Sequence, residues 1–170
     1  MATTRKTKSP MIQLKPPDDR DWLAAYGKVA AHSALLDLVM SMTIKVITEV
    51  SVEDALRATR RTPASALRKR VRKLAKDRLG DGPAFIELEA ILCLAEEWAE
   101  ERNSLIHSVF ARDEAGNPII QDPVRGHLTI PTVKELETLA SQIEQVHGTL
   151  NHSRLKGSLK AALGKRPKKR

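Results

Sequence analysis

The sequence predicts an all-α fold: a bundle of four main helices with one or two short helices and a small irregular or hairpin excursion near residues 111–130. Two observations predict this class. Apolar residues recur at helical spacing through four long stretches, and capping residues stand in front of them. Aromatic residues make up only 3% of the chain, so its core must consist mainly of Leu, Ile, Val and Ala.

A chain of 170 residues with 41% hydrophobic composition suits a single domain. Residues 1–17 mix Thr, Lys and Pro without periodicity and are expected to form a disordered basic arm. The helical domain is expected over residues 18–155, and the many Lys and Arg residues of 156–170 predict a basic tail.

The first helix is predicted from its acidic start. Asp18, Asp19 and Asp21 place carboxylates where the helix macrodipole favours them, and a long helical pattern follows as far as Ile47.

Two further start signals follow in the next part of the chain. Ser51 is expected to cap a short helix that ends at Thr59. Thr62 can cap the next helix, and Pro63 suits its first position, so a helix is predicted over Pro63–Leu79.

This third helix carries the densest positive charge in the domain. Exposed helix faces normally mix charges of both signs, and a nearly uniform positive face repels itself. Phosphate binding and simple solvation are both open interpretations of this face. Its candidate nucleic-acid-binding residues are Arg61, Arg68, Lys69, Arg70, Arg72, Lys73 and Lys76.

The central helix begins at Pro83, and its pattern of apolar residues continues to Phe110. Asn103 and His107 are four residues apart, so they lie one turn apart on one face. Arg102 lies about 100° to one side. No acidic residue is spaced to face Arg102 from within this helix, so its guanidinium needs a partner from elsewhere.

The last helix begins with a capping box formed by Thr132 and Glu135. His147 and His152 lie along it, but their spacing does not favour a shared metal ion, and no cysteine or carboxylate completes a set. The sequence therefore predicts neither a metal site nor a cofactor.

Composition limits the functional classes. The net charge of +8 favours an anionic partner, either nucleic acid or an acidic protein. The single cysteine, Cys93, excludes an intramolecular disulfide, and its leucine neighbours predict a buried thiol. No apolar run reaches the ~18 residues that span a bilayer. A cytoplasmic protein that does not enter the membrane is expected.

The pattern Arg-Asn-x-x-x-His formed by Arg102, Asn103 and His107, late in a long helix after an acidic run, resembles the signature of HEPN domains. The order of predicted helices between Asp19 and Leu155 is similar as well. This resemblance implies an all-α bundle of the kind found in toxin–antitoxin, abortive-infection and RNA-processing systems. Many such domains are metal-independent endoribonucleases whose site forms across a homodimer.

The resemblance implies a role for each of the three residues. His107 would transfer protons, because an imidazole titrates near neutral pH. Arg102 would hold the scissile phosphate through its planar guanidinium, and Asn103 would orient the imidazole or the phosphate. The implied partners are RNA, a second copy of the chain and a cognate antitoxin protein.

Two other functions are open at this point. The chain could be a catalytically inactive HEPN-like module that binds RNA or a partner protein through its basic helix. It could also be a structural dimerisation protein whose basic tails bind nucleic acid without sequence specificity.

Overall fold

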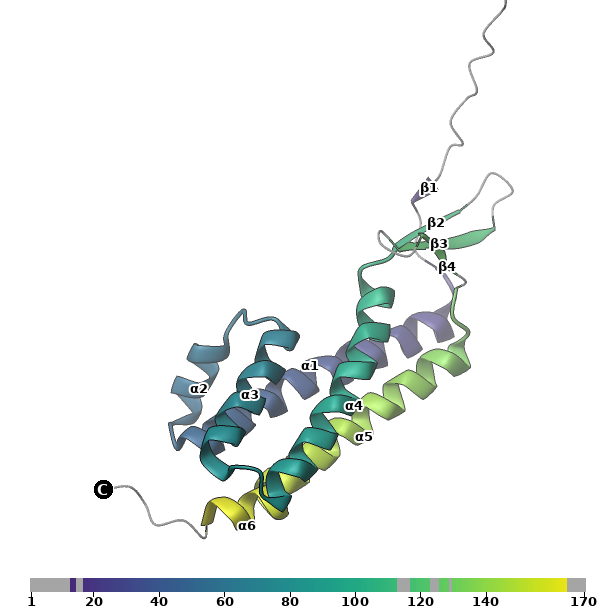
Figure 1. Cartoon of the computed structure of the whole chain (residues 1–170). Helices are drawn as coiled ribbons and strands as arrows, with labels where there is room; N and C mark the ends of the chain where they lie inside the picture. Colours follow the sequence, from purple (N-terminus) through teal and green to yellow (C-terminus); the bar gives the residue numbers. More distant parts are fainter. Residues whose placement is uncertain (1–12, 15–16, 113–116, 123–125, 129, 165–170) are drawn as a thin grey trace, which may run out of the picture.

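The computed structural model describes residues 13–14, 17–112, 117–122, 126–128 and 130–164. The all-α class is confirmed: most of the described chain is helical, and a small sheet lies at one end (Figure 1). The four long helices are α1 (Arg20–Thr48), α3 (Ala64–Leu79), α4 (Pro83–Ile106) and α5 (Val133–Leu155). Two short helices, α2 (Val52–Thr59) and α6 (Ser158–Gly164), accompany them.

Most of the predicted helix starts are confirmed. Asp19 caps α1 by accepting hydrogen bonds from two backbone amides, and Ser51 caps α2. Thr132 and Glu135 form the predicted capping box of α5. The prediction for α3 was wrong by one residue, because Pro63 occupies the N-cap position itself and the helix has no side-chain cap.

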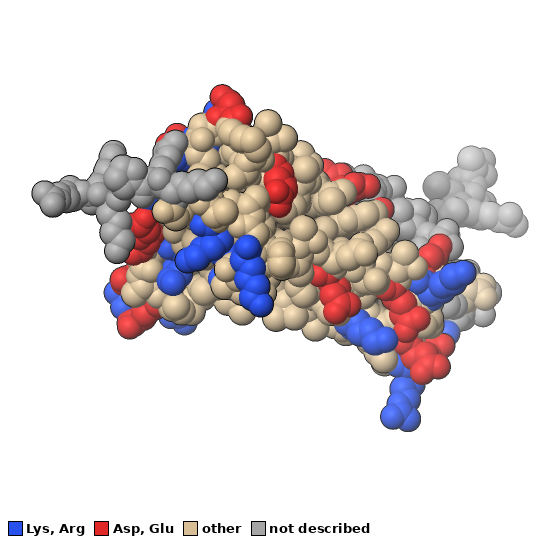
Figure 2. Space-filling model, turned by 90° about the horizontal axis from the view of Figure 1, so that it is seen from below, with Lys and Arg blue, Asp and Glu red and all other residues tan. Residues whose placement is uncertain are grey.

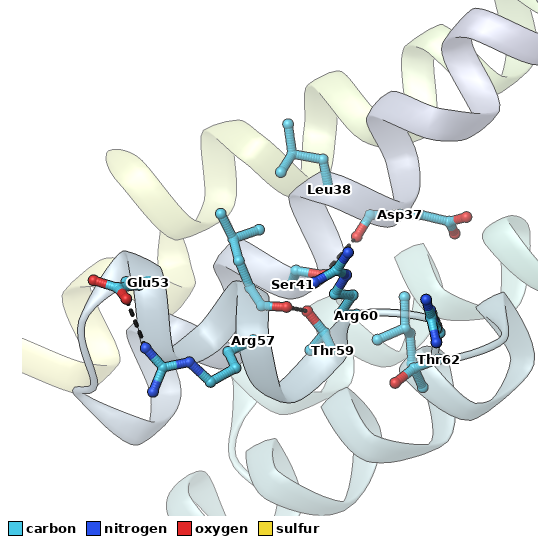
Figure 3. A pocket seen from close by; sticks show the side chains of 11 residues that line it. Asp37, Leu38, Ser41, Glu53, Arg57, Thr59, Arg60 and Thr62 are labelled. Atoms are coloured by element: carbon cyan, nitrogen blue, oxygen red, sulfur yellow. Dashed lines mark hydrogen bonds and ion pairs between the residues drawn. The ribbon is translucent and has the colours of Figure 1, made fainter.

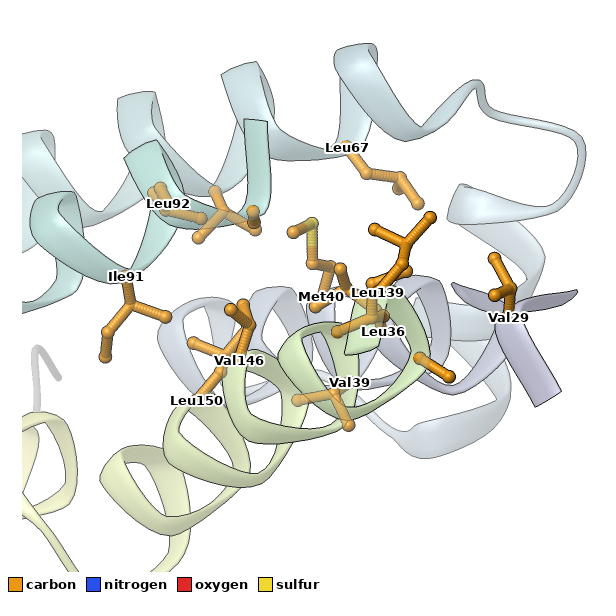
Figure 4. Close-up of a cluster of buried hydrophobic side chains, with 14 of the residues drawn as sticks. Val29, Leu36, Val39, Met40, Leu67, Ile91, Leu92, Leu139, Val146 and Leu150 are labelled. Atoms are coloured by element: carbon orange, nitrogen blue, oxygen red, sulfur yellow. The ribbon is translucent and has the colours of Figure 1, made fainter. Parts of the chain in front are cut away.

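Helix α1 runs through the middle of the bundle and contacts α2, α3, α4 and α5. Its side chains Val29, Met40 and Ile44 are almost completely buried and belong to one core cluster with Leu92 of α4 and Leu150 of α5. In Figure 4 Val29 lies at one end of this cluster and Leu92 at the other. Burial of a large aliphatic side chain stabilises the fold by about 1.5–3 kcal/mol. The predicted aliphatic core is therefore confirmed.

Length and composition alone would allow α1 to cross a membrane, since an 18-residue window of it has a mean hydropathy of 1.4. The prediction concerned an unbroken apolar run of about 18 residues, and Asp37 interrupts the apolar sequence of α1, so the helix meets the test by its average hydropathy and not by such a run. Core helices of soluble proteins and signal sequences pass the same test. The buried face of α1 packs on α3, α4 and α5, which accounts for its apolar composition.

The small sheet is antiparallel, in the order β1 (Gln13–Leu14), β2 (Val109–Arg112), β3 (Pro118–Asp122) and β4 (Gly126–Leu128). The hairpin of β2 and β3, with Phe110 opposite Ile120, agrees with the predicted excursion but begins two residues earlier. Phe110 packs edge-on against Trp22, with ring centroids 5.4 Å apart. This contact attaches the sheet to the first turn of α1.

Two segments outside the predicted domain contain regular structure. Gln13 and Leu14, expected within the disordered arm, pair with Arg112 and Ala111 of β2. Helix α6 lies within the expected basic tail, and its Leu159 is completely buried. The packed domain thus continues beyond residue 155. Residues 1–12, 15–16 and 165–170 of the predicted arm and tail lie outside the described residues.

Candidate functional site

The three residues of the motif lie at the C-terminal end of α4. The helix ends at Ile106, and His107 is its C-cap residue, whose N–H donates a hydrogen bond of 3.0 Å to the carbonyl of Asn103. The predicted continuation of the helix to Phe110 was wrong. From Val109 onward the backbone pairs with β3, so these amides bond across the sheet instead of along the helix.

Asn103 and His107 are both exposed, one helical turn apart, as their spacing predicts. Arg102 is only partly exposed and points another way. It lines a narrow cavity together with Asp37 of α1 and Arg68 of α3. In the described part of the chain no hydrogen bond joins Arg102 to His107.

Asp37 is the carboxylate that Arg102 lacks within its own helix. Burial raises the pKa of Asp37 above its ordinary value, and the positive charges of Arg102 and Arg68 act against this rise. Asp37 is thus a carboxylate from outside α4 that shares the cavity of Arg102, although no ion pair joins the two side chains in the described structure. Asp37 was not among the predicted site residues, although it is the only acidic residue between Asp21 and Glu49. An isolated carboxylate in such an apolar stretch was the signal.

Arg68 was predicted on the exposed basic face of α3, and this prediction was wrong. The residue is buried, with only 5% of its surface exposed. Burial lowers its pKa, while the nearby carboxylates of Glu96 and Asp37 favour the charged form. Its Nε atom is buried and makes no hydrogen bond within the described structure. Arg68 and Arg102 therefore place two guanidinium groups around the single carboxylate of Asp37 in this cavity.

Other predicted nucleic-acid-binding residues are engaged with neighbours. Arg72 Nε lies 2.8 Å from Glu89 Oε1, and this hydrogen bond is the main reason that the pKa of Arg72 is raised. Lys76 pairs with Asp81, and Arg70 donates to the carbonyl of Ala58 at 3.0 Å.

The predicted nucleic-acid-binding residues therefore form two groups, one buried or bound to neighbouring residues and one exposed without such partners. Lys69 and Lys73 are exposed, with neither an ion pair nor a hydrogen bond in the described structure, and exposed Arg61 lies before α3. Figure 2 shows one face of the molecule, on which a broad uncharged area separates charges of both signs at the left from charges of both signs at the lower right. That face does not form a uniform positive surface.

Among the described residues, no group of three or more His, Cys, Asp or Glu side chains is placed to hold a metal ion. His147 lies near His32 of α1 rather than pairing with His152, and Nδ1 of His32 is 3.1 Å from Nε2 of His147. Cys93 is exposed, so the prediction of a buried thiol was wrong. Its Sγ faces Oε1 of Glu89 at 3.8 Å.

No protein-family model matches this chain, and neither does any curated protein or solved structure.

Proposed function

We propose that the chain is a HEPN-like, metal-independent endoribonuclease of the cytoplasm, a toxin or defence element that cleaves cellular RNA. One observation carries the proposal. The end of α4 presents Asn103 and His107 to solvent side by side, while Arg102, next to them in sequence, lies beside a second arginine, Arg68. The last two turns of this helix thus supply an imidazole and an amide on its exposed face and a guanidinium in the neighbouring cavity.

These residues can perform cleavage by internal transfer. The His107 imidazole takes the proton from a ribose 2′-OH, whose oxygen attacks the adjacent phosphorus. The bond from phosphorus to the 5′-oxygen breaks, and an imidazolium returns a proton to that oxygen. The products are a 2′,3′-cyclic phosphate and a 5′-hydroxyl. The reaction therefore consumes no water, and the steps described need no metal ion.

Arg102 would stabilise the negative charge that grows on the phosphate oxygens. Asp37 lines the same cavity as Arg102, and the positive charge of Arg102 acts on its carboxylate, which supports a charged guanidinium at this place. Arg68 adds a second positive charge beside Asp37, and the carboxylates of Glu96 and Asp37 both act on it. Asn103 would orient the imidazole or the phosphate.

A single histidine at the end of α4 would have to serve as both base and acid. A homodimer supplies a second histidine, and this is the reason to propose a site shared between two copies around a two-fold axis. Two exposed apolar side chains provide contact area, Leu94 in the middle of α4 and Val109 at the start of β2, and they are 47% and 42% exposed. A cognate antitoxin is the further partner proposed.

One observation favours the second candidate, an inactive module that binds RNA or a partner protein. Arg102 faces Asp37 and Arg68, and no direct bond within the described chain connects it to His107. An arginine that serves only to balance the partly buried carboxylate of Asp37 would contribute to stability and not to cleavage.

The proposal is tested by incubating the purified protein with end-labelled cellular RNA in EDTA. We expect fragments ending in a 2′,3′-cyclic phosphate, and no cleavage of a matched RNA whose 2′-hydroxyls are methylated. A protein that cleaves only when a divalent metal is added, or leaves all RNAs intact, would refute the proposal.

A further inference from the structure

We propose that the groove between α1, α2 and the turn joining α2 to α3 binds a nucleotide of single-stranded RNA next to the cleaved bond. This inference rests on the proposed function. It assigns a separate binding site, which can be tested without any cleavage.

The groove is open to solvent and has a volume of about 610 Å³. This volume falls within the roughly 300–1,000 Å³ usual for ligand sites. Its apolar wall consists of Leu38 of α1, Leu56 of α2 and Leu67 of α3. Leu38 and Leu56 are 44% and 41% exposed, so a flat apolar group such as a nucleobase can pack against them.

The turn at the edge of the groove has an unusual composition. The N–H of Thr62 donates to the carbonyl of Thr59 at 3.0 Å, so residues 59–62 form a β-turn. Arg60 has φ −55° and ψ 129°, and Arg61 has φ 61°. These angles match a type II turn, whose third position favours glycine. Arg61 holds this left-handed conformation although a side chain disfavours it, and such strain concentrates at functional sites.

The arginines around the groove differ in their partners. Arg57 is turned toward Glu53, whose carboxylate lies 2.6 Å away (Figure 3). Neither Arg60 nor Arg61 has an ion pair or hydrogen bond in the described structure, and both line the groove. The groove also contains the carboxylates of Asp37 and Glu53, but it has three arginines. Two guanidinium groups without an ion pair beside an apolar wall suit a ligand that combines phosphate with a flat apolar surface.

The groove borders on the Arg102 cavity, because Asp37 lines both of them. A strand whose scissile phosphate reaches Arg102 would extend past Asp37 toward Arg60 and Arg61. This neighbourhood of two cationic sites favours RNA over an acidic peptide as the occupant. It also favours a single strand, since only an unpaired base can turn toward the leucines.

The test measures binding of a 2′-O-methylated, fluorescently labelled single strand, which the proposed reaction cannot cleave. The variant carries Arg60→Ala and Arg61→Gly. Glycine adopts the left-handed backbone of position 61 without strain, so the melting temperature of this variant should not fall below that of wild type. The matched control removes two exposed lysines elsewhere, Lys156→Ala and Lys160→Ala.

We expect the groove variant to bind at least tenfold more weakly than wild type. A plot of the logarithm of its RNA-binding constant against the logarithm of salt concentration should have a slope shallower by about 1.4. The variant lacks two phosphate contacts, and each contact on a single strand contributes about 0.7 to the slope. The control should lose less affinity. Binding equal to wild type, a loss matched by the control, or a wild-type preference for a poly-glutamate peptide would overturn the assignment. If the groove variant loses affinity but wild type cleaves no RNA, the groove stands and the proposed catalytic function falls.

Discussion

The imidazoles of His32 and His147 join α1 to α5 through a contact of 3.1 Å between Nδ1 and Nε2. Their ring centroids are 5.4 Å apart, and the ring planes differ by 18°. The centroid distance is about the sum of the N···N distance and one ring radius for each imidazole, as expected for two rings that lie nearly in one plane. The rings therefore meet edge to edge. In this arrangement one nitrogen donates a proton and the other must accept it, so at least one imidazole has to be neutral.

This pair predicts a dependence of stability on pH. Burial and the neighbouring His32 lower the pKa of His147 below its ordinary value of 6.5. Between these two pKa values the unfolded chain binds more protons than the folded protein. The free energy of unfolding should therefore decrease as pH falls from 6.5 through the folded pKa of His147. Urea titrations across this range measure the effect.

The matched variants for this prediction are His147→Gln and His152→Gln, the second at an exposed position on the same helix. His147→Gln should flatten the decrease in unfolding free energy, and His152→Gln should leave it as in wild type. An identical pH profile in wild type and His147→Gln would show that the contact does not control stability.

Exposed and buried cations on α3 should behave differently when reversed. The double change Lys69→Glu and Lys73→Glu should weaken RNA binding without lowering the melting temperature, because both side chains are exposed and unpaired in the described structure. Arg68→Glu should instead destabilise the fold by about 3–5 kcal/mol, since it buries a second carboxylate beside Asp37. Anisotropy titrations and thermal melts separate the two effects. If the double variant binds RNA as tightly as wild type, Lys69 and Lys73 do not contact RNA, and positive charges elsewhere in the chain account for binding.

A homodimer is predicted from the need for two histidines in one site. Sedimentation at micromolar concentration should give twice the chain mass of 18.9 kDa. Charge introduced by Leu94→Glu should shift the equilibrium toward monomer if this exposed face of α4 takes part in the contact. A wild-type protein that sediments as a single chain would remove the shared-site form of the mechanism.

The helix starts could be predicted well from capping residues, because a cap depends only on a few residues that are close together in the sequence. Asp19, Ser51 and Thr132 each satisfy free amides at the start of a helix, and that need does not depend on the rest of the fold. The end of α4 was misplaced because Val109 and Phe110 continue an apolar pattern but pair with β3. Periodicity alone does not record such a pairing partner.

The surroundings of Arg102 could be predicted only in part. Its lack of an acidic neighbour within α4 indicated a partner elsewhere, but Asp37 lies 65 positions earlier in the chain and only the packing of α1 on α4 brings it near. Arg68 was misassigned to the surface for a related reason. It shares a helix with exposed cations, and only the carboxylates contributed by α1 and α4 allow it to be buried.

The most direct test of the central claim compares His107→Ala with His152→Ala, a second exposed histidine, for RNA cleavage in EDTA and for melting temperature. General acid–base catalysis contributes about 10²–10⁴-fold to a rate. We predict a loss of that size for His107→Ala, little loss for His152→Ala, and melting temperatures close to wild type for both. Equal cleavage rates in wild type and His107→Ala would contradict the proposed function.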